Sequence, residues 1–322
     1  MTDQTTAPIA TDDLGDFVDV PGNPRPDGAE LIWFRGIGGR RLRACIAPAL
    51  DQNAARGTCL VCPGRTEFIE KYFETARELQ AKGFAVLILD WPGQGLSDRL
   101  LEDSKKGHID NFETFMGALR NGLDALEHRL PRPYVSLAHS MGGAIALAAI
   151  AQKLVKVEAA AFTAPMWGFN TRIFGMRYLV WAMRVMGRSG DYAQQPGPRE
   201  RFEDNIVTND EERWKLQQAL VDAAPELELG PVTWGWLGAS LNIIGTFAKA
   251  AKIKAVDIPV FLATAEQEKL VDNASHDRVA SLLPDCEHVT VAGAKHEILM
   301  ETDARRAEFW AGFDRLLDRA GI

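Results

Sequence analysis

The sequence predicts an α/β fold in which helices cover both faces of a mostly parallel central sheet. Short apolar segments with strand character alternate with segments of helical periodicity along most of the 322 residues. The strand segments are almost continuously apolar, which is typical of parallel strands that are buried on both faces. An apolar content of 46% supplies enough material for such a core.

The expected elements follow one another in chain order. A hairpin opens the sheet across a glycine-rich turn, with strands at 31–34 and 41–46, and gives the sheet a mixed edge. Further strands are expected at 58–62, 84–90, 134–139, 159–164, 258–264 and 287–292, and helices at 72–82, 111–129, from 140 onward and at 304–319. Ligands of such sheets bind beyond the carboxyl ends of the strands, so we expect the functional site at that edge.

One long segment interrupts the alternation. Residues 165–256 contain five of the eight tryptophans, are helical in character and offer no clear parallel strand. We interpret them as a helical cap that covers the carboxyl edge of a core formed by residues 25–164 and 257–322. Residues 1–24 are expected to form a mobile acidic tail, because no Lys or Arg precedes Pro24 while five aspartates do.

Charge and hydropathy exclude several classes of protein. The net charge of −8 argues against a nucleic-acid partner, since phosphate binding needs clustered basic residues. No uncharged apolar run approaches the length of about 20 residues that a membrane span requires. The amino-terminal residues lack the basic start and apolar core of a secretory signal.

The four cysteines do not indicate a metal site. Cys59 and Cys62 lie three apart in a predicted strand, which puts them on opposite faces, and no second pair completes a zinc site. We expect buried thiols in a reducing compartment, no metal and no cofactor. The expected location is the cytoplasm, with contact at the inner face of the membrane as an alternative.

The strongest chemical signal is a serine at a strand-to-helix junction. The strand that ends before Ser140 runs directly into a helix of small residues, in the pattern Ala138-His-Ser-Met-Gly142. Such a nucleophile elbow holds a serine hydroxyl clear of the sheet, and its usual pattern is Gly-x-Ser-x-Gly. Here alanine takes the first position. Ser140 is therefore the predicted nucleophile.

A serine nucleophile needs a base and an acid that orients the base, in the chain order Ser, acid, His. His296 is the predicted base, because it lies in a glycine-entered loop after a strand, whereas His276 falls in a helix and His288 in a strand.

The acid should follow the strand that ends near residue 264. Glu268 is preferred there, with Asp272 as second choice and Glu266 as third. Asp272 has a competing structural explanation as the N-cap of the next helix.

An oxyanion hole requires two backbone N–H groups that point at the developing negative charge. One is expected from Met141, the residue after the nucleophile. The other is expected from Arg65, which follows Pro63-Gly64 in the loop after the third strand, since glycine there allows close approach to a substrate.

At these motifs the chain resembles the α/β-hydrolases, in the group of bacterial lysophospholipases and monoacylglycerol lipases. The resemblance covers about residues 30–318. It rests on Cys62-Pro-Gly-Arg-Thr-Glu67, Asp90-Trp-Pro-Gly-Gln-Gly-Leu-Ser97, Ala138-His-Ser-Met-Gly-Gly143, Val271-Asp-Asn273 and Lys295-His-Glu-Ile-Leu299. It implies Ser140 as nucleophile, Glu268 as acid, His296 as base and Arg65 and Met141 as oxyanion donors. Many relatives have His-Gly in place of Pro63-Gly64, glycine in place of Ala138 and aspartate as the acid.

The resemblance and the cap composition together suggest a lipid-like ester of glycerol or a lysophospholipid as substrate. Alternatives are a carboxylesterase, thioesterase or peptidase of the same superfamily, or a non-catalytic binding protein on this fold. Residues 173–186 are nearly all apolar apart from Arg177 and Arg184, which share one helical face. We prefer a lid helix that packs its apolar face on the core and turns its arginines to solvent. The alternative is an interfacial segment that contacts anionic lipid.

Overall fold

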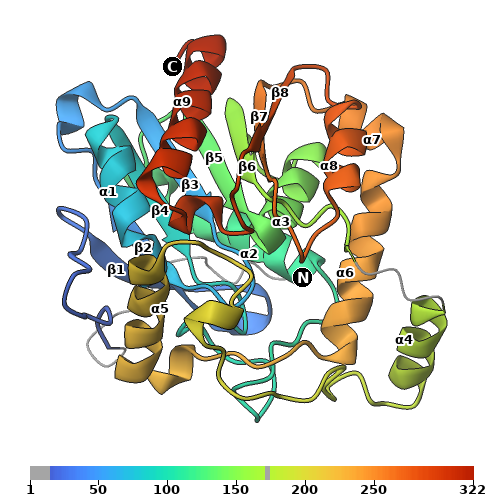
Figure 1. Ribbon diagram of the computed structural model, residues 1–322. Helices are drawn as coiled ribbons and strands as arrows, with labels where there is room; N and C mark the ends of the chain where they lie inside the picture. The colour runs from blue at the N-terminus through green and yellow to red at the C-terminus, as the bar shows by residue number, and fades with distance from the viewer. Residues whose placement is uncertain (1–14, 171–174) are drawn as a thin grey trace.

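The computed structural model describes residues 15–170 and 175–322. Within these ranges, an eight-stranded sheet runs through the centre of the molecule in the order β1-β2-β4-β3-β5-β6-β7-β8 (Figure 1). Its strands are β1 (Glu30–Arg35), β2 (Arg41–Ala47), β3 (Gly57–Cys62), β4 (Phe84–Leu89), β5 (Tyr134–His139), β6 (Ala159–Thr163), β7 (Val260–Ala265) and β8 (Cys286–Val291). The predicted α/β class is confirmed.

The strand directions follow the predicted pattern of a parallel sheet with one mixed edge. β1 and β2 form the expected hairpin, and β2 pairs antiparallel with both β1 and β4. Each of the remaining neighbouring pairs is parallel. The parallel strands therefore all end at one edge, which carries the loops after β3, β5 and β7.

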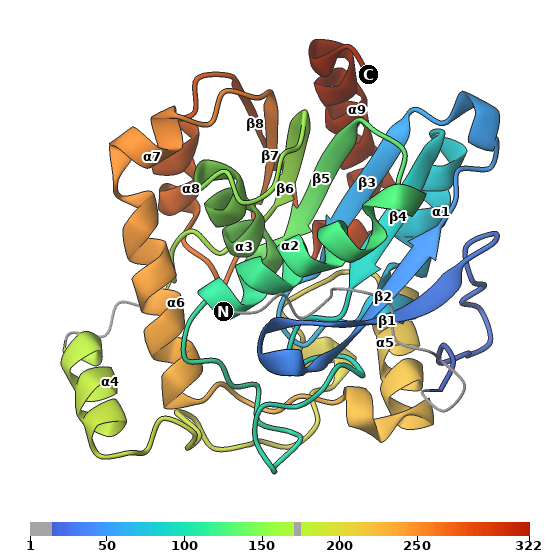
Figure 2. The same ribbon diagram turned by 180° about the vertical axis from the view of Figure 1, so that it is seen from behind.

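Helices cover both faces of the sheet. α1 (Phe73–Ala81) and α9 (Asp303–Ala320) pack on one face, and α2 (Glu113–Leu126), α3 (Ser140–Ala151) and α8 (Asn273–Ala280) pack on the other (Figure 2). The alternation along each strand divides the core between these faces. Cys59 and Cys62 accordingly belong to different apolar clusters, as their spacing predicted.

The segment between β6 and β7 is helical in its described part. It contains α4 (Met176–Val185), α5 (Glu211–Ala223), α6 (Trp234–Phe247) and α7 (Ala250–Lys254), and contributes no strand to the sheet within the described ranges. This arrangement is consistent with a core of 25–164 and 257–322 and a cap of 165–256, which remain predicted boundaries. No helix in the described ranges is long and apolar enough to cross a bilayer.

The amino-terminal segment departs from the expected mobile tail. Residues 1–14 lie outside the described residues, but Phe17 is buried and meets the Phe73 ring edge-on at a centroid distance of 5.3 Å. The side-chain amide of Asn23 donates to the Glu70 carbonyl at 2.8 Å. The expectation of a tail through residue 24 is therefore wrong for this part, because one aromatic side chain anchors an otherwise acidic segment.

A buried ion cluster joins the segment before α1 to the loop after β4. The Arg43 guanidinium donates to Glu70 at 2.8 Å and to Asp90 at 2.7 Å, and all three side chains are fully buried. Asp90 also accepts from the Ile69 N–H at 2.9 Å. Charges taken from water are stable only when paired in this way. The cluster fixes both segments beside the carboxyl end of β3.

Candidate active site

The backbone at Ser140 adopts the sharp turn that the elbow motif predicts. Ser140 joins β5 to α3 and has a left-handed φ of 49°, a conformation that costs a non-glycine residue about 1–2 kcal/mol. A Cβ at Gly142 would lie 2.1 Å from the Cys62 carbonyl oxygen, so only glycine lets α3 begin this close to β3. Ala138, in the altered first position, is fully buried in β5.

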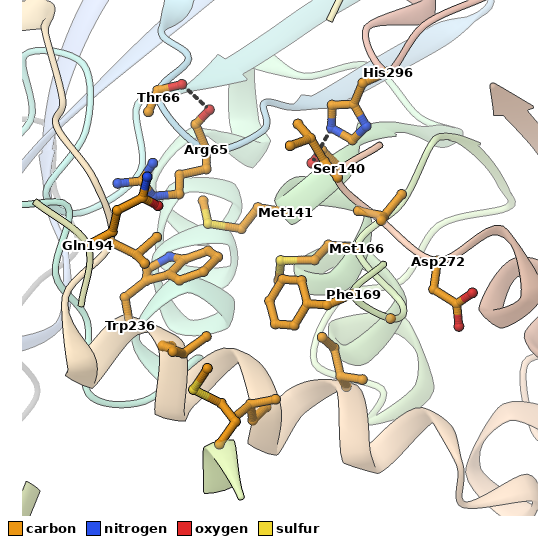
Figure 3. A pocket seen from close by; sticks show the side chains of 18 of the residues that line it. Arg65, Thr66, Ser140, Met141, Met166, Phe169, Gln194, Trp236, Asp272 and His296 are labelled. Carbon is orange, nitrogen blue, oxygen red and sulfur yellow. Dashed lines mark hydrogen bonds between the residues drawn. The ribbon is translucent and has the colours of Figure 1, made fainter. Parts of the chain in front are cut away.

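The His296 ring lies between Ser140 and Glu268, within hydrogen-bond distance of both side chains. Nε2 of His296 is 2.9 Å from the Ser140 Oγ, and Nδ1 is 2.6 Å from Glu268 Oε2 (Figure 3 shows the serine and histidine). An ionised carboxylate only accepts, so Nδ1 carries the proton and donates it toward Glu268. Nε2 is then free to accept from the serine hydroxyl.

Glu268 is held as a carboxylate by its surroundings. Its side chain is 1% exposed, and Oε1 accepts from the N–H groups of Leu270 at 2.7 Å and Val271 at 3.2 Å. Burial alone would raise the pKa of this carboxyl. The hydrogen bond and charge of His296 and the two backbone donors outweigh burial and lower the pKa below its ordinary value.

The two alternative acids are occupied elsewhere. Asp272 caps α8 by accepting from the Ala274 N–H at 3.1 Å, and its other oxygen is 3.3 Å from the Arg278 guanidinium. Glu266 accepts from the Gly293 N–H at 2.8 Å and thereby braces the loop that carries His296. The geometry favours Glu268, the acid that the sequence placed first.

His139, beside the nucleophile, is a neutral supporting residue. Its Nδ1 donates to the Thr163 carbonyl at 3.0 Å, and its ring lies 4.9 Å from the His296 ring, centroid to centroid. Burial lowers the pKa of His139 to about 4. The His139 ring is therefore uncharged at neutral pH and adds no positive charge beside His296.

The loop that carries Arg65 is fixed by the glycine-rich segment after β4. The Trp91 indole N–H donates to the Pro63 carbonyl at 2.8 Å, and the Gln94 side-chain amide donates to the Gly64 carbonyl at 3.0 Å. Both predicted oxyanion donors, Arg65 and Met141, line the same cavity as Ser140. Sequence reasoning did not reveal this supporting role of residues 91–97.

A buried lysine ties the Arg65 loop to the histidine loop. The Lys71 ammonium is 2.8 Å from Glu67 and 2.7 Å from Glu297, the residue after His296. Glu67 also accepts from the Gly64 N–H and, at 2.6 Å, from the Tyr72 hydroxyl. Burial by itself would raise the pKa of the Glu67 carboxyl, but Lys71 outweighs it and lowers the pKa. Sequence reasoning missed this bridge.

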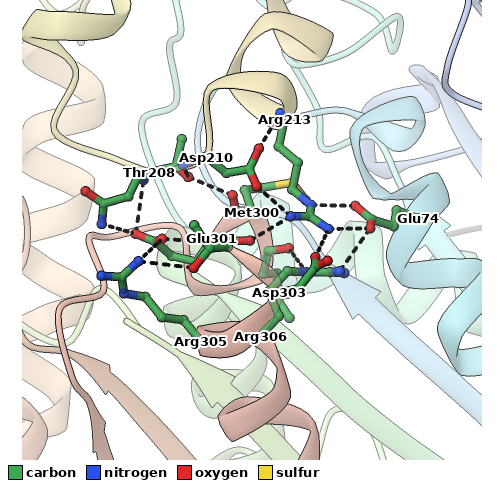
Figure 4. A network of polar contacts seen from close by, with 12 residues as sticks. Glu74, Thr208, Asp210, Arg213, Met300, Glu301, Asp303, Arg305 and Arg306 are labelled. Atoms are coloured by element: carbon green, nitrogen blue, oxygen red, sulfur yellow. Dashed lines mark hydrogen bonds and ion pairs between the residues drawn. The ribbon is translucent and has the colours of Figure 1, made fainter.

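The beginning of α5 fastens the cap to the segment that follows His296 (Figure 4). Arg213 donates to the Glu301 carbonyl at 3.0 Å and pairs with Glu74 at 2.7 Å and Asp303 at 2.6 Å. The Thr208 hydroxyl donates to the Met300 carbonyl at 2.7 Å. The histidine loop is therefore held by both core and cap.

A cavity of about 880 Å³ opens beside Ser140. One wall is the inward face of α6. The large apolar side chains of the lining, those of α6 included, comprise Met141, Met166, Phe169, Val207, Val232, Trp236, Leu237, Leu241, Ile244, Leu270 and Val271. Within the described ranges, no group of three His, Cys, Asp or Glu side chains is arranged to hold a metal ion, and the four cysteines are free thiols.

α4 leaves several large apolar side chains exposed, contrary to the preferred lid interpretation, although Val180 and Met183 are buried. Tyr178, Trp181 and Val185 are 79%, 66% and 67% exposed. Arg177 and Arg184 instead reach back, donating to the carbonyls of Leu241 at 3.1 Å and Asp110 at 3.4 Å. The helix packs on α6 rather than on the core, which leaves its outer face uncovered; residues 173 and 174 of the predicted segment lie outside the described residues.

A serine at a strand-to-helix elbow, facing a histidine and a carboxylate at the carboxyl edge of a mostly parallel sheet, defines the class of α/β-hydrolases. A family model described as "Serine aminopeptidase, S33" matches residues 53–303, more than half of the chain. The chain belongs to this family.

The similar proteins with curated names are lipid hydrolases. The chain is 33% identical to lysophospholipase L2 of Escherichia coli (strain K12), over 77% of this chain and 76% of the relative. It is 27% identical to a monoacylglycerol lipase of Mycolicibacterium smegmatis, over 84% of this chain and 91% of the relative. The resemblance drawn from the sequence motifs is thereby confirmed.

Solved structures of lipases share the fold. A soluble variant of monoglyceride lipase from Saccharomyces cerevisiae, in complex with a substrate analog, superposes with a TM-score of 0.68 at 16% identity, covering 91% of this chain and 96% of its own. A monoacylglycerol lipase of Paleococcus ferrophilus gives 0.66 at 17% identity, covering 86% and 99%. These likenesses confirm the α/β-hydrolase fold.

Replacing Glu268 by Gln should lower kcat for ester hydrolysis at least about 100-fold, because an amide neither enforces the tautomer nor stabilises the imidazolium. Asp272→Asn is the matched control, since asparagine still caps a helix, and its kcat should stay within about threefold of wild type. Loss of activity in Asp272→Asn alone, at unchanged melting temperature, would show that the acid is Asp272.

Proposed function

We propose that the protein is a serine hydrolase that cleaves a carboxylic ester of a lipid, a lysophospholipid or a monoacylglycerol, through an acyl-enzyme on Ser140. The observation that carries the proposal is the connected series Ser140, His296 and Glu268 at the mouth of an apolar cavity. The names of the similar proteins support the same chemistry.

In the proposed first half-reaction, the Ser140 Oγ attacks the ester carbonyl carbon while Nε2 of His296 takes its proton. The negative charge on the carbonyl oxygen is stabilised by the N–H groups of Arg65 and Met141. The bond to the alcohol oxygen then breaks, and the alcohol leaves with the proton from His296. Glu268 stabilises the imidazolium between these two proton transfers.

In the second half-reaction, His296 takes a proton from water, which attacks the acyl carbon. The bond to Ser140 breaks, the serine recovers its proton from His296, and the fatty acid leaves. The same donors act on the second oxyanion. No metal or cofactor is required for either half-reaction.

The cavity lining favours a lipid over a peptide, although the family description names an aminopeptidase. A peptide amino terminus is a cation and needs a free carboxylate. The carboxylates in the lining are already paired: Glu67 and Glu297 with Lys71, and Asp272 with Arg278. The apolar wall of α6 suits an acyl chain.

A hydrolysis panel tests the proposal. Lysophosphatidylglycerol, a monoacylglycerol with the same acyl chain and p-nitrophenyl acetate would be compared, with Ser140→Ala as the blank. We expect kcat/KM for both lipids to exceed that for the short ester by at least about tenfold, since burial of each CH₂ contributes about 0.8 kcal/mol. Preference for the short ester alone would defeat the lipid assignment.

We also propose that the outer face of α4, formed by Tyr178, Leu179, Trp181, Val185 and Met186, rests on a lipid surface. These are five of the eight large apolar side chains exposed within the described ranges. Tyr178 also lines the cavity, so the exposed face continues into the proposed acyl site. Aromatic and aliphatic side chains on one helix face insert into the headgroup region of a bilayer.

Vesicle co-sedimentation tests this contact. Trp181→Ser should weaken the partition of the protein onto phosphatidylglycerol–phosphatidylcholine vesicles at least about fivefold, because a buried indole contributes a large apolar area. Leu50→Ser is the matched control, since Leu50 is 59% exposed but lies outside α4. Equal binding of wild type and Trp181→Ser would contradict the proposed contact.

The cytoplasm remains the proposed location. It is supported by the four free thiols, three of which are buried in the core. Thiols of this kind are typical of a reducing compartment.

A further inference from the structure

The side chain of Arg65 offers a second group at the cavity, separate from the backbone N–H that we propose as an oxyanion donor. Its Nη2 donates to the Gly230 carbonyl at 2.5 Å, and its guanidinium carbon lies 5.4 Å from the centre of the Trp236 ring. A Cβ at Gly107 would come within 2.8 Å of Nη2, so the absence of a side chain there leaves room for the guanidinium. The guanidinium is therefore held in a defined position at the cavity wall.

This cation has no countercharge among the described residues. In residues 15–170 and 175–322, no carboxylate lies within ion-pair distance of Arg65, and its buried Nε–H has no acceptor. The buried cations Arg43 and Lys71, by contrast, are paired: Arg43 with Glu70 and Asp90, and Lys71 with Glu67. Arg65 is partly exposed where it lines the cavity, and its Nε is shielded from water. A cation that loses part of its hydration without a partner is costly, and an anion in the cavity would offset that cost.

Burial lowers the pKa of Arg65 to about 10, so the side chain still carries its positive charge at neutral pH. A guanidinium of this kind presents a planar fork of N–H groups that matches the oxygens of phosphate or carboxylate. The arrangement is thus suited to bind an anion supplied from outside the protein.

The cavity has a polar corner and an apolar chamber on different sides of Met141, the residue after Ser140. In Figure 3, Arg65 and Gln194 lie on one side of Met141, and Met166 and Phe169 lie on the other. An acyl chain belongs in the apolar chamber, so the alcohol portion of the ester would extend toward Arg65. Both Arg65 and Gln194 line the cavity that contains Ser140.

We propose that the Arg65 guanidinium, together with the Gln194 amide, forms a subsite for an anionic group on the alcohol portion of the substrate, such as the phosphate of a lysophospholipid. This inference rests on the proposed ester hydrolase function and adds a preference within it. An ester whose glycerol carries a phosphate is preferred over the corresponding neutral monoacylglycerol.

Binding of non-hydrolysable ethers tests the subsite without requiring turnover. On a Ser140→Ala background, 1-O-octylglycerol and 1-O-octylglycerol 3-phosphate would be titrated by calorimetry below their micelle concentrations. The phosphate should bind at least about tenfold more tightly, consistent with a charge-assisted pair. Adding Arg65→Gln should reduce the ratio to about twofold or less, and Arg65→Lys should keep an intermediate ratio because it retains charge without the fork.

Arg278→Gln is the matched control, since Arg278 borders the same cavity but is paired with Asp272, and it should keep the tenfold ratio. The hemisuccinate of octylglycerol distinguishes a carboxylate from a phosphate as the preferred anion. The proposed subsite is wrong if Arg65→Gln leaves the affinity ratio of the two ethers unchanged, or if the protein with Arg65 intact shows no preference for the phosphate. If no ester in the hydrolysis panel is cleaved but the affinity ratio still depends on Arg65, the ester hydrolase function is wrong and the anion site remains.

Discussion

The site depends on the close approach of α3 to the end of β3. Because Gly142 has no side chain, the helix begins against the Cys62 carbonyl, and Ser140 is forced into a left-handed turn with its hydroxyl clear of the sheet. The Met166 N–H donates to the Ser140 carbonyl at 2.8 Å and helps to hold this turn. The cost of the strained residue, about 1–2 kcal/mol, is small beside the burial of α3, nearly all of whose side chains are in the core.

From this fixed point, buried polar contacts position the remaining groups. Lys71 joins the Arg65 loop to the loop of His296 through two carboxylates, and the cap holds the same histidine loop from the other side through the Val207 carbonyl, which accepts from the Glu297 N–H at 2.7 Å. A buried ammonium between two carboxylates is stable only when all three groups are present, because removing any one leaves an uncompensated charge. The Arg65 loop and the His296 loop are thus parts of one connected unit.

The fold and the three side chains that meet at the site were predictable because their signals are local. Apolar strand segments predict the sheet, the elbow motif indicates Ser140, and chain order indicates His296 and a carboxylate near Glu268. The Lys71 bridge was not predictable, since Glu297 lies far away in the sequence and a charged residue in a helical segment is normally solvated. Phe17 was missed, and the exposed face of α4 was only the second interpretation, for a related reason: a sequence pattern reveals apolar side chains but not what covers them. The unpaired state of Arg65 likewise depends on contacts between distant segments.

The proposed function depends on activation of the Ser140 hydroxyl by His296 in the folded protein. Labelling of the intact protein with a fluorophosphonate, followed by peptide mass spectrometry, tests it most directly. We expect one adduct per chain, on Ser140, that is absent in Ser140→Ala and forms much more slowly in a His296→Gln variant of unchanged melting temperature. No adduct on the folded protein, or an adduct on another serine, would contradict it.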